Sequence, residues 1–342
     1  MLRYIAKRIL FMVPVLLGIS FLAFLLMYFT PGDPAQMLLG DLAPKQDVEA
    51  LREEMSLNDG FFPRYFRYMG GLLQGDLGTS YTTKLPVWDE IAARLPVTAR
   101  ITFFVMLFSV AVGVPIGILS AVRQYSLIDS VARVLAMLGV TMPSFWLALL
   151  LVLLFSVNLG WLPASGLYGP LYYVLPVLSI SAVSLATIMR TARSGMLEVV
   201  RQDYIRTARA KGQRESVVLF RHALKNALIP ILTIVGIQFA NGLGGAVVNE
   251  QVFAIPGIGK LMVDAIKAIN YPLVQGSVLV LAVLQSAVNL LVDILYAFVD
   301  PRIRSQYDGG GKAPRHTKKP ALRPSGAPAT GREEPVGGGE GE

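Results

Sequence analysis

The chain has 342 residues, of which 54% are hydrophobic and only 16% are charged, and its formal net charge is +8. Soluble domains carry about 25% charged residues, so this composition excludes an ordinary soluble enzyme and indicates a bilayer as the solvent. The absence of cysteine excludes thiolate metal sites and cysteine nucleophiles, and two histidines in the whole chain argue against a histidine-rich metal site.

Six runs of about 20 residues are almost free of charge, which is the length at which an α-helix crosses roughly 30 Å of hydrocarbon. The first run is longer than the apolar part of a signal peptide, and we interpret it as an uncleaved anchor. The sequence therefore predicts an all-α, polytopic membrane protein with six transmembrane helices. The expected spans are Ile9–Phe29, Ile101–Val122, Val134–Val157, Leu171–Met189, Leu228–Val248 and Val278–Val299.

The positive charges alternate between the connecting segments, and cytoplasmic segments retain positive charge. Segment 190–227 carries nine cations against three acids and the tail from Asp300 carries eight cations, whereas segment 30–100 carries seven cations against ten acids. Both termini are therefore expected inside the cell. The inside connections are 123–133 and 190–227, and the outside ones are 30–100 and 249–277. The charge is a topology signal, and nucleic acid is not an expected partner.

Segment 30–100 is too long for a simple turn and contains helix-like pieces, one of them with Asp59 as a candidate N-cap. We expect a small external cap, which serves either as a spacer or as a docking surface for an external partner. The pieces are Pro44–Leu57, Phe61–Gln74 and Pro86–Arg94.

The chain divides into three expected regions. An anchor helix and external cap occupy 1–96, and a transmembrane core occupies 97–304. The remainder, 305–342, is rich in glycine, proline and charge and is expected to be a disordered cytoplasmic tail.

The most informative stretch is the cytoplasmic segment 190–227. Apolar side chains recur there at spacings of 3, 4 and 4, which predicts one apolar helical face. Gly212 permits a positive φ where this short helix would end, and a second helical piece is expected from about Glu215 into the fifth span. Such a helix suits docking against another protein. The apolar positions are Leu197, Val200, Tyr204 and Ala208.

Several ordered motifs carry a family resemblance. The sequence Asp203-Tyr-Ile-Arg-Thr-Ala-Arg-Ala-Lys-Gly212 resembles the coupling loop of ABC-importer permeases, in the branch that handles dipeptides, oligopeptides and nickel. The resemblance covers about 1–304 and implies a type I ABC-importer permease fold with both termini inside. Further matching segments are Gly75–Tyr81, Arg94–Thr98, Arg221–Pro230, Val252–Gly259, Tyr271–Gly276 and Asn289–Arg302.

The resemblance implies the permease subunit of an ATP-driven importer of di- and oligopeptides in a bacterial or archaeal plasma membrane. The implied partners are a second, different permease subunit, two cytoplasmic ATPase subunits, an external substrate-binding protein and membrane lipid. This chain would be no enzyme and would bind no cofactor, with ATP and Mg²⁺ on the ATPases; it also lacks a Gly-x-x-x-x-Gly-Lys-[Ser/Thr] phosphate loop. Nickel chelates, glutathione or other small solutes are alternative substrates. An ion-gradient secondary transporter is the alternative from a different class.

The resemblance also assigns the ATPase-coupling loop. Aligned on Gly212, the family motif places its three leading positions on Arg206, Thr207 and Ala208, of which only Ala208 matches. With Asp203, these residues form the predicted coupling site.

Polar residues inside the spans suggest a translocation path. Gln238 and Asn241 lie one turn apart in the fifth span, and Gln285 and Asn289 have an i, i+4 spacing in the sixth; interhelical hydrogen bonding is the alternative. Asp293 is the one ionised residue inside the proposed spans. A structural pairing with a cytoplasmic arginine is favoured there over a proton relay.

The outside segment 249–277 contains a second candidate site. Glu250, Pro256, Gly257 and Gly259 could shape an external gate or contact the binding protein. A tight structural turn is the alternative, since proline and glycine serve any such turn.

Overall fold

The computed structural model describes residues 2–299, and every regular element in that range is a helix. Five of these helices are long and apolar enough to cross a membrane, which confirms the expected all-α membrane protein. They are α1 (Leu2–Phe29), α5 (Val87–Val122), α8 (Val174–Val200), α11 (Leu224–Gly245) and α14 (Tyr271–Val299).

The third expected span is broken. α6 (Leu127–Thr141) stops before Pro143, and α7 (Ser144–Leu151), continued by the π-helical turns Val152–Asn158, is bent by 106° from it. The expectation of one continuous helix over Val134–Val157 is therefore wrong. Pro143 has no N–H to continue the hydrogen-bond ladder, and it holds the preceding Met142 in an extended conformation.

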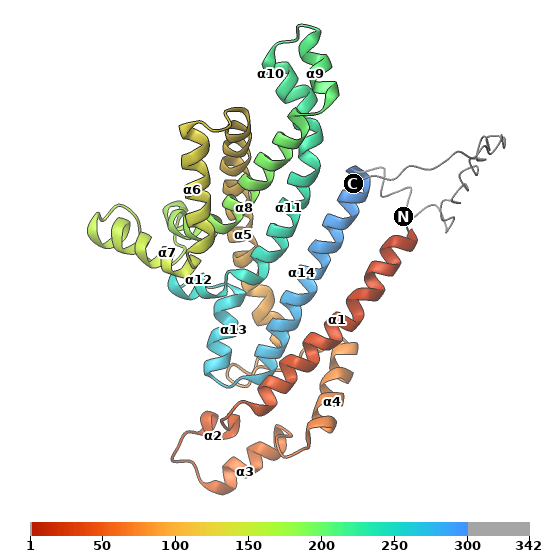
Figure 1. Ribbon diagram of the computed structural model, residues 1–342. Coiled ribbons are helices and arrows are strands. Elements are labelled where there is room, and N and C mark those ends of the chain that lie inside the picture. Colours follow the sequence, from red (N-terminus) through yellow and green to blue (C-terminus); the bar gives the residue numbers. More distant parts are fainter. Residues whose placement is uncertain (1, 300–342) are drawn as a thin grey trace, which may run out of the picture.

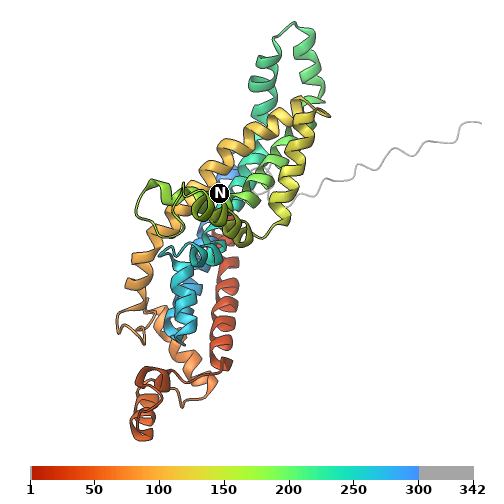
Figure 2. The same ribbon diagram turned by 90° about the vertical axis from the view of Figure 1, so that its left-hand side faces the viewer.

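The two ends of the molecule differ. Figures 1 and 2 place the cap helices α2, α3 and α4 at one end and the helical hairpin α9–α10 at the other. The start of α1 and the end of α14 point toward the hairpin end (Figure 1), as the alternation of charge predicts. These helices span Pro34–Leu39 (α2), Lys45–Glu54 (α3), Phe61–Leu73 (α4), Asp203–Ala210 (α9) and Glu215–Val217 (α10).

Glycines on α5 allow α8 to pack closely against it. A Cβ at Gly117 would lie 2.5 Å from the carbonyl oxygen of Met189 and 2.7 Å from Cβ of Ala192. A Cβ at Gly113 would lie 3.0 Å from the carbonyl oxygen of Leu185. Small residues therefore bring the two backbones together, as is common in membrane helix pairs.

The cap differs in detail from the expectation. α4 begins after Gly60, and Asp59 is not its N-cap but forms an ion pair with Arg67 at 2.7 Å. The piece expected at Pro86–Arg94 is the first part of α5, which runs unbroken across the expected boundary between residues 96 and 97.

α2 was not expected from the sequence. Asp33 caps it by accepting a hydrogen bond from the backbone N–H of Ala35, and the same carboxylate pairs with Arg52 of α3 at 2.6 Å. The expected tail, 305–342, lies outside the described residues.

Candidate functional site

The hairpin end of the molecule contains the predicted coupling loop. α8 ends at Val200, and α9 starts at Asp203 after a two-residue break. The break resets the helical phase, so Ile205 and Ala208 form the buried face of α9, while Tyr204 is exposed. The expected continuous face through Tyr204 is therefore wrong. The buried pair packs on Met196, Val218 and Ala223.

The chain turns back after α9 at Gly212, which has φ +72°. The expected positive φ is thus confirmed, and a Cβ here would meet no atom within 4 Å. Arg209 donates two hydrogen bonds to the carboxylate of Glu215 across the turn, at 3.1 and 2.6 Å. The Arg209 guanidinium lowers the pKa of Glu215, and the helix from Glu215 continues through π-helical turns into α11, as expected. The hairpin is therefore a folded projection.

The predicted coupling residues have different positions on this hairpin. Asp203, Arg206 and Thr207 are exposed, with Asp203 and Arg206 3.9 Å apart. Ala208 is buried within the hairpin and Gly212 forms its turn. The three exposed residues are accessible to a partner, whereas the buried Ala208 and the turn residue Gly212 hold the hairpin in shape.

The external candidate site is centred on Glu250 of α12 (Val247–Val252), whose side chain is fully buried. Its carboxylate accepts hydrogen bonds from the Thr98 hydroxyl at 2.8 Å and from the backbone N–H of Lys260 at 3.0 Å. Oγ1 of Thr98 in turn accepts from the backbone N–H of Ile258 at 2.9 Å. Burial raises the pKa of Glu250, and these hydrogen bonds oppose that shift.

Glu250 and its neighbours form a structural joint. The carboxylate lies at the start of α13 (Ile258–Lys267), where the helix dipole favours negative charge. Gly257 and Gly259 are required there, since a Cβ on either would collide with the Glu250 side chain or with Cα of Val247. Pro256, in the same turn, is half-buried. The joint fixes α12 and α13 to α5, and Glu250 itself is inaccessible to an external partner.

Two further motif segments are joined by Asn270, which is buried. Its side chain donates to the Ser80 hydroxyl at 2.8 Å and accepts from the backbone N–H of Tyr81 at 3.1 Å. The segments Gly75–Tyr81 and Tyr271–Gly276 thus lie together, although nearly 190 residues separate them. The glycine- and proline-rich motifs of the sequence are points of contact between distant elements.

The four polar residues proposed for a translocation path are not all brought together. Nε2 of Gln285 lies 3.4 Å from Oδ1 of Asn241, which links α14 to α11. Gln238 instead contacts the Ser184 hydroxyl of α8 at 3.3 Å. Asn289 lines a separate groove between α1 and α14. Interhelical hydrogen bonding accounts for these two contacts, and so for three of the four proposed residues.

Asp293 faces the same groove as Asn289. Nη1 of Arg8 lies 2.9 Å from its carboxylate, so the expected pairing with a cytoplasmic arginine is confirmed. The pair joins α1 to α14.

A buried charged cluster near the hairpin was missed. Asp129, at the start of α6, pairs with Arg193 of α8 at 2.8 Å and accepts hydrogen bonds from the Ser120 hydroxyl and the backbone N–H of Tyr125. Ser126, which caps α6 through the N–H of Asp129, was the available sequence signal. Arg193 was counted only as a loop cation because α8 extends past the expected end at Met189.

Comparison with known proteins identifies the relatives of this chain. The family model for the inner membrane component of binding-protein-dependent transport systems matches residues 113–305, and the model for the N-terminal part of such components matches residues 1–102. The dipeptide transport system permease protein DppB of Alkalihalophilus pseudofirmus is 42% identical over 332 residues, covering 89% of this chain and 100% of that protein. The glutathione transport system permease protein GsiC of Pectobacterium atrosepticum is 42% identical over 304 residues, covering 89% and 99%.

A solved structure has the same fold. A chain of the MetNI methionine ABC transporter, in an inward-facing conformation, superposes with a TM-score of 0.53 at 18% identity and covers 61% of this chain and 96% of that chain. The likeness at this identity concerns the fold alone. It supports the type I importer permease fold expected from the motifs.

Proposed function

The chain belongs to the family of inner-membrane components of binding-protein-dependent transport systems, and from this premise we propose that it is the permease subunit of an ATP-driven importer of short peptides. It is a multi-pass protein of the cell's inner membrane. Its helices form half of the translocation path, and a second, homologous permease forms the other half. An external binding protein delivers the substrate. Two cytoplasmic ATPase subunits bind ATP and Mg²⁺, so this chain needs no cofactor and catalyses no reaction.

The observation that carries this proposal is the α9–α10 hairpin. It is a folded projection at the cytoplasmic end, with a sealed apolar interior at Ile205 and Ala208 and an exposed face at Asp203, Arg206 and Thr207. A folded projection with an exposed face can bind a neighbouring ATPase subunit and transmit the movement of that subunit to this chain.

Contacts at the same end of the molecule can transmit movement of the hairpin to the membrane helices. The hairpin begins where α8 ends, and the Asp129–Arg193 pair ties α8 to α6, while the Ser120 hydroxyl adds α5 to the cluster. A displacement of the hairpin is therefore delivered to three helices together. ATP-driven movement of the ATPases would in this way alternate the path between its inward-open and outward-open states.

Short peptides are the proposed substrates because a relative named for dipeptide transport aligns over its full length. Glutathione is the second candidate, since a relative named for glutathione transport is equally similar. Both are small and carry free carboxylates. The external binding protein is expected to make most of the selection between them, and nickel chelates remain a less supported class.

The proposal is tested by purification of the tagged full chain from its own cells in mild detergent. Two ATPase polypeptides, a second permease and a binding protein are expected to copurify, and substrate bound to that binding protein identifies the cargo by mass spectrometry. Isolation of the chain as a self-sufficient transporter that uses an ion gradient would overturn the proposal.

A further inference from the structure

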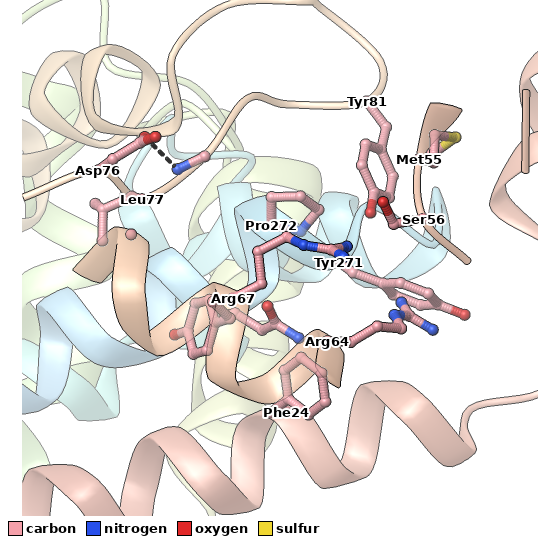
Figure 3. Close-up of a pocket in the computed structure, with 14 residues that line it drawn as sticks. Phe24, Met55, Ser56, Arg64, Arg67, Asp76, Leu77, Tyr81, Tyr271 and Pro272 are labelled. Atoms are coloured by element: carbon pink, nitrogen blue, oxygen red, sulfur yellow. Dashed lines mark hydrogen bonds between the residues drawn. The ribbon is translucent and has the colours of Figure 1, made fainter. Parts of the chain in front are cut away.

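A pocket of about 210 Å³ lies in the external cap, away from the hairpin and from the α11–α14 contacts. Its walls come from α1, α4, the segment before α5 and the start of α14, and Figure 3 shows their side chains converging on it. Six of its lining residues matter here: Arg64, Arg67, Tyr68, Tyr81, Tyr271 and Gln275. The pocket is smaller than typical sites for drug-sized ligands, which suits a solute of amino-acid size.

Arg64 is the central cation of this pocket. Its guanidinium lies over the ring of Tyr28 at 5.6 Å and over the ring of Tyr271 at 6.0 Å from the ring centres. No acidic side chain of the described residues pairs with it. The two rings thus hold the guanidinium in place by cation–π attraction, while its N–H donors are left for another acceptor.

Two buried polar groups in the same pocket also have no partner. Gln275 is 6% exposed, and its amide makes no hydrogen bond to any described residue. The Tyr68 hydroxyl is buried and likewise unpartnered. Buried polar groups are normally hydrogen-bonded, so two such groups beside an unpaired guanidinium point to a ligand that accepts hydrogen bonds. Burial raises the pKa of Tyr68, which keeps its hydroxyl a donor.

The other charges of the pocket are already engaged. Arg67 pairs with Asp59 at 2.7 Å, and the carboxylate of Asp76 accepts a hydrogen bond from the N–H of Gly78 at 2.7 Å (Figure 3). Arg64 is therefore the lining arginine that has no acidic partner, while the exposed Asp76 keeps its negative charge and adds to the cost of binding a dianion. One guanidinium with neutral donors around it matches a planar monoanion better than a doubly charged phosphate.

We propose that this cap pocket binds the carboxylate of a small external solute, with Arg64 as its ion-pair partner and Gln275 and Tyr68 as hydrogen-bond donors. The pocket lies apart from the α11–α14 contact proposed for a translocation path, so occupancy of the pocket is measured by binding, independently of uptake. A solute bound there would cross-link α1, α4 and α14 and stabilise the cap against them.

The test uses the full chain in lipid nanodiscs and two probes that differ only in charge, N-acetylalanine and N-acetylalanine amide. Ligand-observed NMR titration is expected to show saturable binding of the acid and at least about tenfold weaker binding of the amide, as the loss of a charge-assisted hydrogen bond implies. Equal binding of the two probes, or no saturable binding of the acid, would overturn the proposal.

Variants locate the site. Arg64→Gln and Gln275→Glu are each expected to weaken binding of the acid at least about tenfold. Arg64→Lys keeps the charge and should weaken binding less. The matched control, Arg67→Gln, should weaken binding by less than about threefold. Unchanged binding of the acid in folded Arg64→Gln protein would contradict the assignment. Inorganic phosphate serves as a competitor. If phosphate displaces the acid at equal concentration, the pocket is a phosphate site and the carboxylate assignment is wrong.

Discussion

Nε of Arg193, on α8, lies 2.8 Å from Oδ1 of Asp129, which is fully buried at the start of α6. A second hydrogen bond joins Nη2 of Arg193 to Oδ2 of Asp129 at 3.0 Å. The pair is bidentate, and it sits on the helix that leads directly into the α9–α10 hairpin. It ties α8, the helix that leads into the hairpin, to α6.

Asp129→Asn is expected to destabilise the protein by about 3 kcal/mol, because it leaves the guanidinium of Arg193 without its carboxylate in a buried setting. Chemical unfolding in mixed micelles measures the loss. Asp264→Asn is the control: it removes an exposed carboxylate paired with Lys260 and should cost less than about 1 kcal/mol. Equal effects of the two substitutions would contradict the role given to the buried pair.

At Gly212 the requirement for a positive φ can be tested separately from any requirement for a small side chain. Its φ of +72° disfavours β-branched residues, although there is room for a side chain. Gly212→Val should therefore distort the turn and lower peptide uptake at unchanged membrane insertion, whereas Gly212→Asn should keep most of the uptake, because asparagine tolerates this conformation. Full uptake in Gly212→Val, at wild-type protein levels, would show that the turn is not needed for coupling.

Thr98 completes the joint around Glu250 with one hydroxyl, which donates to the carboxylate and accepts from the N–H of Ile258. Thr98→Val leaves both groups short of a partner in the interior and should cost about 1–3 kcal/mol of unfolding free energy. Thr98→Ser keeps the hydroxyl and is the matched control. Hydrogen exchange at the start of α13 should rise in the valine variant only, and unchanged exchange there would contradict the joint.

Asp293 tests the structural interpretation of an ionised residue in a membrane helix. Its partner, Arg8, is partly exposed, so Asp293→Asn should leave uptake within about twofold of wild type. A proton relay would make that carboxylate essential. Loss of uptake at normal protein levels in Asp293→Asn would therefore favour the relay.

Much of the fold could be predicted because it depends on local signals. The apolar runs located the membrane helices, and Gly212 indicated the hairpin turn. The segments Arg94–Thr98 and Val252–Gly259 stood out in the sequence and meet in the structure through the hydrogen bond from the N–H of Ile258 to Oγ1 of Thr98. Residues that make contacts between distant segments are recognisable as sequence motifs, but a motif alone does not identify the segment that it contacts.

The remaining features depend on three-dimensional context. The apolar run over Val134–Val157 shows only that each residue prefers lipid or protein, and so it did not show how far the helix bends at Pro143. Asp129 lacked any nearby sign of its partner, since Arg193 is 64 residues away. Ile205 replaced Tyr204 on the buried face because a two-residue break changed the helical phase.

The proposed function is best tested by uptake of labelled dialanine into proteoliposomes that contain this chain, its second permease and the two ATPases, with the binding protein supplied. We predict accumulation that requires ATP and that falls sharply in Arg206→Glu, which reverses charge on the exposed hairpin face. The matched substitution Arg123→Glu, outside the hairpin, should have a smaller effect. Accumulation without ATP, driven by an ion gradient and equal in both variants, would contradict the proposed function.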